Sequence, residues 1–230
     1  MRLADATWPE VEGRTSGTPT VLVLPVGALE QHGPHLPLDT DATTATAVAE
    51  GVVAARPGAV LAPTLPYGAS DEHADFPGTI SIGTEALRDV LVAIVRGSAT
   101  TFDAVLAING HGGNAAGIRA AIETCASEGR VLARHHLGLA GMDARAGRSE
   151  TSLLLHLTPE RVRTELAETG NTTPIREIIE EMRARGVRAL SPNGVLGDPT
   201  DATAEHGTEM RAALVELALD AYDDVARSVA

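Results

Sequence analysis

The sequence predicts one domain of the α/β class, in which a mostly parallel sheet lies between two layers of helices. Apolar runs of strand length alternate with amphipathic stretches of helix length over residues 21–136, as in sheets that are buried on both faces. The chain has 230 residues, a length that one α/β domain commonly reaches, and its hydrophobic content of 43% is enough for one core. No repeat or low-complexity linker divides it. We therefore expect residues 1–230 to form a single three-layer α/β/α domain.

The first part of the chain provides the strands and the helices between them. The expected order is strand 21–28, helix 43–55, strand 59–65, helix 84–97, strand 104–108, helix 115–127 and strand 131–136. Pro57 and Gly58 end the first of these helices, and Thr84 is placed to cap the second. A glycine-rich turn follows the third strand.

The remainder is expected to be helical, with one long loop. Residues 150–157 have a helical pattern, and Pro159 stands at the first position of a further helix. Another helix begins after Pro174 and ends at Gly186, and residues 203–229 form the closing helix. Residues 187–203 are rich in proline and glycine. A loop of this length in a compact domain is usually functional or lies at an interface.

Composition excludes several classes of partner. The chain has 18 basic and 31 acidic residues, so its net charge of −13 repels nucleic acid and anionic membrane surfaces. No apolar run is long enough to span a membrane, and the amino-terminal segment does not resemble a signal peptide. The only cysteine, Cys125, cannot form an internal disulfide and is expected to be a buried thiol. These features favour a cytoplasmic protein.

Residues with metal-ligating side chains gather after alternate strands. The three segments are residues 30–41 after the first strand, residues 109–114 after the third, and residues 149–152 beyond the fourth. Ligands bind at the carboxyl ends of the strands in open parallel sheets. Chance rarely places such clusters after alternate strands while other loops stay plain. The three segments therefore predict a site at this edge.

Mixed imidazole and carboxylate groups suit Zn²⁺, Mn²⁺ or Fe²⁺ better than Ca²⁺ or Mg²⁺. In an extended turn Glu30 and His32 point the same way, and Asp41, at the entry of the next helix, can return to the same place. A carboxylate that bridges two cations holds them about 3.5–4 Å apart. The alternatives are that single residues of this set are solvated, or that Asp39 or Asp41 only caps a helix.

Residues 110–115 also fit a loose form of the dinucleotide-binding fingerprint. Against that function, the turn follows the third strand, and the next strand ends in His135 and His136 where an acidic ribose ligand should stand. The glycines are better explained as bringing the backbone and His111 close to a substrate.

These segments resemble the creatininase family, also called creatinine amidohydrolase-like proteins. The matching segments are residues 25–41, 76–79, 109–114 and 150–152, of which the first and third together are highly specific. Further runs at residues 67–70, 81–87, 194–200 and 202–204 are most similar to peptide-cleaving members of the family. With them the resemblance covers most of the chain after residue 20. It implies a creatininase-like fold and hydrolysis of an amide bond.

The resemblance also implies two divalent metal ions per subunit, Zn, Fe or Mn, and four ligands, namely Glu30, His32, Asp41 and His111, with Asp41 bridging. In creatininase itself a glutamate two positions after the last histidine completes the second metal's shell. Gly113 stands there in this chain. Glu150 is therefore our candidate for the missing ligand and for an acid or base. We expect substrate contacts from His73, Gly112, Gly113, Asn114 and Asp143.

Position 145 departs from the family pattern. The family usually has a histidine five residues before the glutamate of Glu-Thr-Ser, and this chain has Arg145. Arginine remains protonated at any pH that a protein survives, so it cannot act as a general acid or base. We expect it to anchor the substrate or steady an oxyanion, while Glu150, another histidine or a bridging water carries the proton. The alternative is that Arg145 points to solvent.

The expected function is metal-dependent amide hydrolysis. The resemblance to the peptide-cleaving members implies that the substrate is a small ribosomal precursor peptide, from which a modified C-terminal Val-Tyr unit is removed. It also implies a homo-oligomer, usually a hexamer. Rival activities within the family are creatinine ring opening and formamide hydrolysis. Rivals from other classes are a non-catalytic metal-binding module, if Arg145 has abolished activity, and a nicotinamide-dependent oxidoreductase.

Overall fold

The computed structural model describes residues 1–15 and 19–230. Its centre is a sheet of four parallel strands in the order β2-β1-β3-β4. The strands are β1 (Val21–Val26), β2 (Ala59–Leu61), β3 (Ala104–Asn109) and β4 (Leu132–His136). β1 and β3 pair along their whole length, from Val21 opposite Ala104 to Val26 opposite Asn109. The loops that follow these two central strands therefore leave the sheet side by side.

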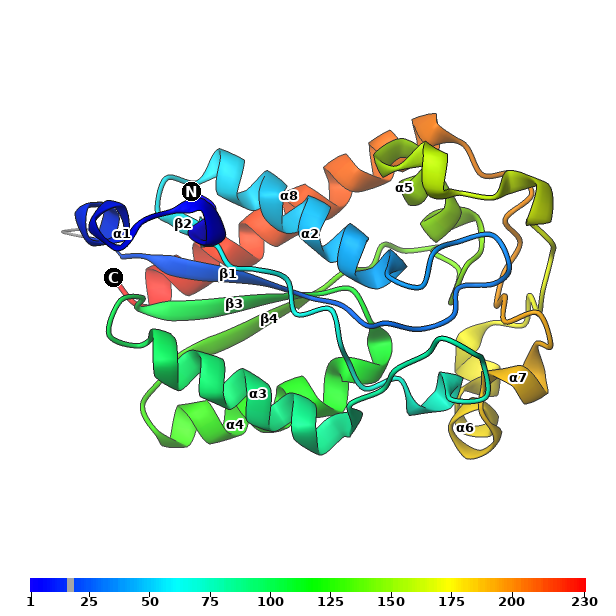
Figure 1. Cartoon of the computed structure of the whole chain (residues 1–230), viewed down its shortest axis with the longest axis horizontal. Helices are drawn as coiled ribbons and strands as arrows, with labels where there is room; N and C mark the ends of the chain where they lie inside the picture. The colour runs from blue at the N-terminus through cyan, green and yellow to red at the C-terminus, as the bar shows by residue number, and fades with distance from the viewer. Residues whose placement is uncertain (16–18) are drawn as a thin grey trace.

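Helices cover both faces of the sheet (Figure 1). One layer contains α2 (Thr40–Ala55), α5 (Arg148–Leu157) and α8 (Ala204–Ser228). The opposite layer contains α3 (Gly83–Ser98) and α4 (Ala115–Ser127). Three short helices lie outside these layers, namely α1 (Trp8–Thr15), α6 (Ile175–Arg185) and α7 (Val187–Leu190).

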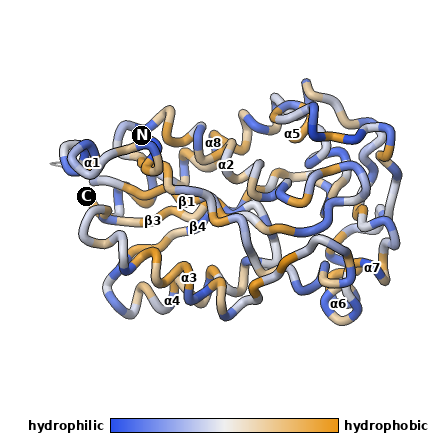
Figure 2. The backbone as a smooth tube through the Cα atoms, in the orientation of Figure 1, coloured by the Kyte–Doolittle hydropathy of each residue, from blue (hydrophilic) through white to orange (hydrophobic). Residues whose placement is uncertain are grey.

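Alternate strand residues supply the two halves of the core. Val21 and Val23 face α2 and α8, whereas Leu22 and Leu24 face α3 and α4. Figure 2 shows the hydrophobic colour concentrated along the strands and the inner faces of the helices. Nearly all of the buried apolar side chains are aliphatic, as the low aromatic content predicts. Burial of this surface is the main favourable term that holds the three layers together.

The structure confirms the predicted three-layer α/β architecture and the alternation of its elements, and it corrects four details. The second strand ends at Leu61 rather than at residue 65, because Pro63 has no N–H to continue the ladder. Thr84 lies inside α3 and does not cap it, since the helix begins at Gly83 after Ile82. The helix expected from Pro159 is one short turn, Pro159–Arg161. The long loop contains α7 at its start.

Other local predictions are confirmed. Gly186 ends α6 with a φ of 76°, a conformation that glycine adopts without a Cβ penalty. Thr203 caps α8, because its side chain accepts a hydrogen bond from the His206 N–H. Cys125 is buried, and burial raises the pKa of its thiol. Among the described residues, none of the helices has the length and hydropathy needed to cross a membrane.

Candidate metal centre

The four residues predicted as metal ligands come together at the carboxyl ends of β1 and β3. Glu30 and His32 lie in the loop after β1, Asp41 is the second residue of α2, and His111 lies in the turn after β3. All four are at most 2% exposed. The pairing of β1 with β3 brings the two loops together, and the start of α2 returns Asp41 to the same place.

The facing atoms of these residues lie at distances suited to a shared ion. Ligand atoms of Glu30, His32 and Asp41 all lie within 4.8 Å of one another. Asp41 divides its two oxygens, with Oδ1 3.2 Å from His32 Nε2 and Oδ2 3.4 Å from His111 Nδ1. His111 Nδ1 is also 3.1 Å from Glu30 Oε1. Four ligands about 2.0–2.2 Å from a tetrahedral ion lie roughly 3.3–3.6 Å from each other, so this spacing fits.

Both histidines are oriented by backbone carbonyl groups on their outer side. His32 Nδ1 is 3.1 Å from the Glu30 carbonyl oxygen, and His111 Nε2 is 2.9 Å from that of Ala69. A ring N–H donated to each carbonyl leaves the lone pair of the other nitrogen directed into the cluster. Metal-bound histidines are commonly held in this way.

The cluster has a negative potential that favours cations. Glu30 Oε2 and Asp41 Oδ2 are buried and have no hydrogen-bond partner among the described residues. Burial alone would lower the pKa of His111, but the carboxylates of Glu30 and Asp41 together outweigh burial and raise it to about 9. Burial also opposes the charged form of His32, yet Asp41 and Glu150 together raise its pKa. The donor set, its burial and its unpartnered oxygens therefore fit a divalent transition metal.

Arg145 does not point to solvent but enters the cluster. Its guanidinium forms an ion pair with Glu30, and its Nη1 lies 2.8 Å from His32 Nε2. Its Nη2 lies 3.2 Å from His111 Nδ1. The residue is only 7% exposed. The alternative that Arg145 is a solvated side chain is therefore wrong.

Glu150 lies at the rim of the cluster on α5. Its Oε2 accepts a hydrogen bond from the Ala146 N–H at 2.5 Å and lies 3.9 Å from His32 Nε2. The side chain is 16% exposed. Burial raises the pKa of its carboxyl group. This position is compatible with either an outer ligand or an acid–base group.

The predicted substrate contacts divide into two groups, and the first adjoins the ligands. His73 Nε2 is 3.6 Å from Glu30 Oε1, and burial lowers the pKa of its ring to about 2. Gly112 is exposed, and a Cβ there would meet nothing within 4 Å. At Gly113, by contrast, a Cβ would overlap His111 Nε2 and the Ala69 carbonyl oxygen. The missing side chain at position 113 is what allows His111 its place.

The second group braces the backbone. Asn114 is fully buried: its Oδ1 accepts from the Ala69 N–H, and its Nδ2 donates to the Gly27 carbonyl and to Asn109 Oδ1. The structure thus gives Asn114 a positioning role. Asp143 accepts hydrogen bonds from the first N–H groups of α5, those of Arg148 and Ser149. It also lies on the wall of a cavity of about 690 Å³.

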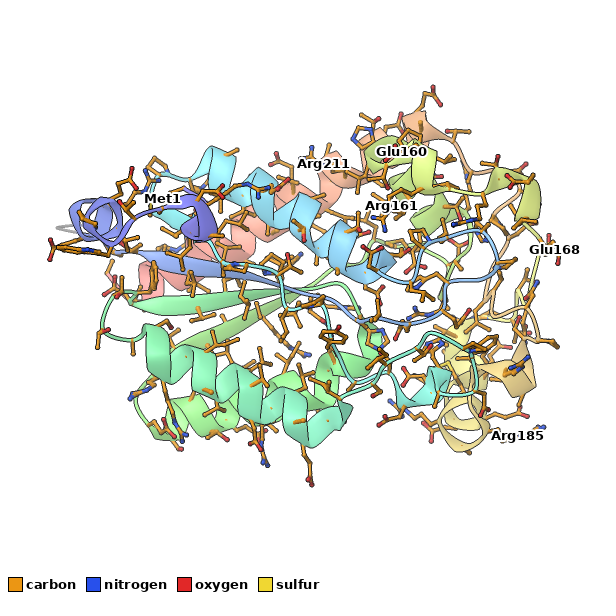
Figure 3. The ribbon with its side chains drawn as sticks, viewed as in Figure 1. Met1, Glu160, Arg161, Glu168, Arg185 and Arg211 are labelled. Atoms are coloured by element: carbon orange, nitrogen blue, oxygen red, sulfur yellow. The ribbon has the colours of Figure 1, made fainter. Side chains whose placement is uncertain are left out.

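Two residues beside the cluster, Glu72 and Gln31, were not predicted from the sequence. Glu72 Oε1 is 3.6 Å from His111 Nε2, and its side chain is 20% exposed. Gln31 is buried, with its Nε2 3.0 Å from His73 Nδ1 and donating to the Gly194 carbonyl at 3.0 Å. Glu72 directly precedes His73, so its place in that acidic run was a usable signal. Asp39 takes no part in the cluster, since it pairs with Arg161. Figure 3 labels Arg161, which lies beside α2.

Comparisons with known proteins identify the family of this chain. A family model described as "Creatininase: Creatinine amidohydrolase" matches residues 4–222. A "Mycofactocin precursor peptide peptidase" of Mycobacterium ulcerans is 45% identical over 219 residues, which covers 92% of this chain and 83% of the relative. A protein of the same description from Mycolicibacterium smegmatis is 47% identical over 205 residues, covering 87% of this chain and 83% of the relative.

Solved structures agree in fold. "Creatininase Mn" superposes with a TM-score of 0.82 at 26% identity and covers 97% of both chains. A creatininase mutant described as "Zn-Zn type" has a TM-score of 0.81 at 26% identity and also covers 97% of both chains.

Proposed function

This chain belongs to the creatininase family and is a hydrolase of amide bonds, and from that premise we propose that it cleaves a small precursor peptide at a metal centre. The observation that carries the proposal is the buried cluster at the ends of β1 and β3. It contains two imidazoles and two carboxylates whose facing atoms are close enough to share an ion.

We assign the metal ligands to five residues, namely Glu30, His32, Asp41, His111 and, at the rim, Glu150. The cluster has two halves, since each oxygen of Asp41 faces a different imidazole, and two divalent ions, Zn, Fe or Mn, would be bridged by that carboxylate. When bound, such an ion supplies a Lewis acid for the scissile carbonyl group and lowers the pKa of water. Removal of the Asp41 carboxylate would therefore affect both halves.

Arg145 and Glu150 are the proposed catalytic residues. Arg145 cannot take up a proton, so its part is to place a fixed positive charge beside the oxygen that becomes negative in the transition state. Glu150 stands within 3.9 Å of His32 Nε2. From this position Glu150 could take up a proton from the attacking water and pass it to the departing amine.

The substrate assignment rests on the relatives. Both peptidases described above share about half of their residues with this chain over most of its length. We therefore propose a modified mycofactocin-type precursor peptide as substrate and release of its C-terminal Val-Tyr unit as the reaction. His73 and the open backbone at Gly112 adjoin the cluster on the sides where a peptide could contact it. Gly113 and Asp143 complete the proposed substrate-contacting surface, and Asn114 holds the backbone behind it.

Two further assignments belong to this proposal. The single, buried cysteine supports a reducing cytoplasmic setting. Exposed apolar side chains support a homo-oligomer, hexameric or similar, and they include Trp8 at 75%, Ile80 at 50% and Tyr67 at 41% exposure. Light scattering that reports only the 23.8 kDa monomer would exclude the oligomer.

The test of function is mass spectrometry of the modified precursor peptide after incubation with the purified chain and Zn²⁺, Fe²⁺ or Mn²⁺. We expect a product shorter by the C-terminal dipeptide unit and no product after chelation. Creatinine and a formamide, assayed in parallel, distinguish the rival activities of the family. Full metal binding without turnover of any of the three substrates would favour a non-catalytic metal-binding module.

A further inference from the structure

We propose that Arg145 serves as the second cation of the cluster, so that the chain binds one divalent ion tightly and a second only weakly. This inference rests on the metal ligands assigned in the proposed function. It concerns the effect of Arg145 on the number of tightly bound ions. Neither the fold nor the relatives determine that number.

The guanidinium occupies the side of both imidazoles on which an ion would bind. Its Nη1 is 2.8 Å from His32 Nε2, and its Nη2 is 3.2 Å from His111 Nδ1. These are the nitrogens whose lone pairs are directed inward, because the outer nitrogens face backbone carbonyls. Arg145 also pairs with Glu30. One residue thus reaches three of the four proposed ligands.

A guanidinium has five N–H donors and no acceptor, so it cannot itself ligate a metal. Every lone pair that it engages is one that an ion must take from it. An ion in one half of the cluster displaces one of the two nitrogen contacts and leaves the other. A second ion must displace both and force the whole guanidinium out of a buried site.

Charge leads to the same result. Glu30 and Asp41 are the fully buried carboxylates, and Arg145 cancels one of their two negative charges. One divalent ion reverses the remaining charge, and a second adds two more positive charges beside an arginine that cannot release its proton. Glu72 and Glu150 offset part of this from the rim, where their side chains are 20% and 16% exposed. Repulsion between a unit and a double charge a few ångströms apart weakens the second binding step by at least about 100-fold.

The backbone holds Arg145 in this position. Its N–H donates to the Leu196 carbonyl at 3.2 Å, and its carbonyl accepts from the Leu196 N–H at 2.9 Å. The next residue, Ala146, is the only described non-glycine residue with a positive φ, at 50°. Strained backbone of this kind persists where the surroundings fix it. Two backbone hydrogen bonds to Leu196 and the fixed conformation of Ala146 therefore hold the arginine in the cluster.

The test is calorimetric titration of Zn²⁺ into the metal-stripped full chain, prepared without a polyhistidine tag. We expect one tight step and a second step at least about 100-fold weaker. Arg145→Met removes the charge at similar length, and Arg145→Lys keeps the charge. The methionine variant should take up two ions with affinities within about tenfold of each other, whereas the lysine variant should keep the single tight step. Arg96 lies on α3 and forms an exposed ion pair with Glu128. Arg96→Met is therefore the matched control and should bind Zn²⁺ as the unaltered chain does.

Several outcomes would overturn the inference. Two equally tight ions in the unaltered chain would do so and would leave the proposed function intact, whereas no tight ion at all would refute the proposed metal centre itself. A folded Arg145→Met chain that still takes one ion would also refute the role of Arg145. If Arg145→Met is unstable, melting temperatures provide a second measurement. Unfolding of this variant on chelation and refolding with Zn²⁺, neither of which the control should show, would support the need for a cation at this position.

Discussion

Asp41 is the residue on which both halves of the cluster depend. It is 2% exposed, and its two oxygens face His32 and His111 separately. Asp39, only two positions earlier, has a side chain 37% exposed that pairs with Arg161 instead. Two aspartates of one loop therefore have different surroundings, and they offer a matched pair for mutation.

Asp41→Ala should remove nearly all bound metal, because the variant loses the carboxylate whose two oxygens face different imidazoles. Asp39→Ala should retain its metal and lose at most about 1 kcal/mol of stability with the partly exposed ion pair. Elemental analysis of the two purified variants measures the difference. Full metal content in Asp41→Ala would refute the bridging assignment.

Gly113 and Gly112 form a second matched pair. A Cβ at position 113 would overlap His111 Nε2 and the Ala69 carbonyl, whereas at position 112 it would meet nothing within 4 Å. Gly113→Ala should therefore displace His111 and lower metal affinity by about 10–100-fold, the range seen when a group that orients a ligand is disturbed. Gly112→Ala should bind metal normally. Equal affinities in the two variants would show that the position of His111 does not depend on Gly113.

His35 should make stability sensitive to acid. Burial, aided by the nearby charge of His32, lowers the pKa of His35 from 6.5 to about 4. Between these values the unfolded chain binds more protons than the folded chain, so the free energy of unfolding falls as the pH drops through this window and is unaffected above it. His35→Gln should lose less stability than the unaltered chain between pH 7 and pH 4, by up to about 3 kcal/mol. Denaturation curves of both chains at each pH measure the free energy of unfolding. An equal decrease of that free energy with falling pH in the two chains would contradict the role of His35.

At the scale of residues, the sequence predicted best those side chains that stand directly after a strand. Glu30, His32 and His111 follow β1 and β3, whose parallel pairing the alternation of elements predicts. Asn114 and Asp143 were harder to assign, because their polar side chains serve neighbouring backbone groups and only the folded chain reveals those partners. The inward direction of Arg145 depends on its pairing with Leu196, a contact between segments far apart in the sequence.

Among the elements, α5 and α8 pack closely, and this packing positions Glu150. Gly207 of α8 lies against the Ser152 carbonyl and the His156 Cβ of α5, where an added Cβ would overlap both. Gly97, near the end of α3, has nothing within 4 Å of its own added Cβ. Position 207 therefore has no space for a side chain, whereas position 97 does.

Gly207→Ala should destabilise the chain by about 1–3 kcal/mol, since the helices must separate to admit the methyl group. Gly97→Ala should be neutral or stabilising by up to about 1 kcal/mol, because alanine loses less conformational freedom in a helix. Urea denaturation measures both. If Gly207→Ala is as stable as Gly97→Ala, the close approach of α5 to α8 is not required.

Element boundaries were predictable where a local chemical signal marks them. Gly186 and Thr203 mark the end of α6 and the start of α8 as expected. The prediction for Thr84 was wrong, because the backbone turns into α3 at Gly83, whose φ is 74°, before the threonine is reached. The short helix α7 lacks a sequence pattern of its own and is held by tertiary contacts, such as that of Val187 with Ile178 and Leu196.

At the scale of the whole molecule, the sheet separates the chain ends from the site. Figure 1 shows both termini at the amino end of the strands, while the loops that carry Glu30 and His111 leave from the opposite end. The alternation of apolar runs predicted the parallel sheet and its two covering layers. It did not predict how α6 and α7 lie beside residues 71–76, because those contacts join segments far apart in the sequence, through side chains such as Phe76 and Met182.

Anomalous X-ray diffraction from crystals of the Zn²⁺-loaded chain tests whether the buried cluster holds a metal ion. Data collected at the zinc absorption edge locate the ion without reference to activity. We expect an anomalous peak within about 2.0–2.2 Å of an Asp41 oxygen and of His32 Nε2 or His111 Nδ1. The absence of a peak in this cluster, or a peak only at some other place on the chain, would contradict it.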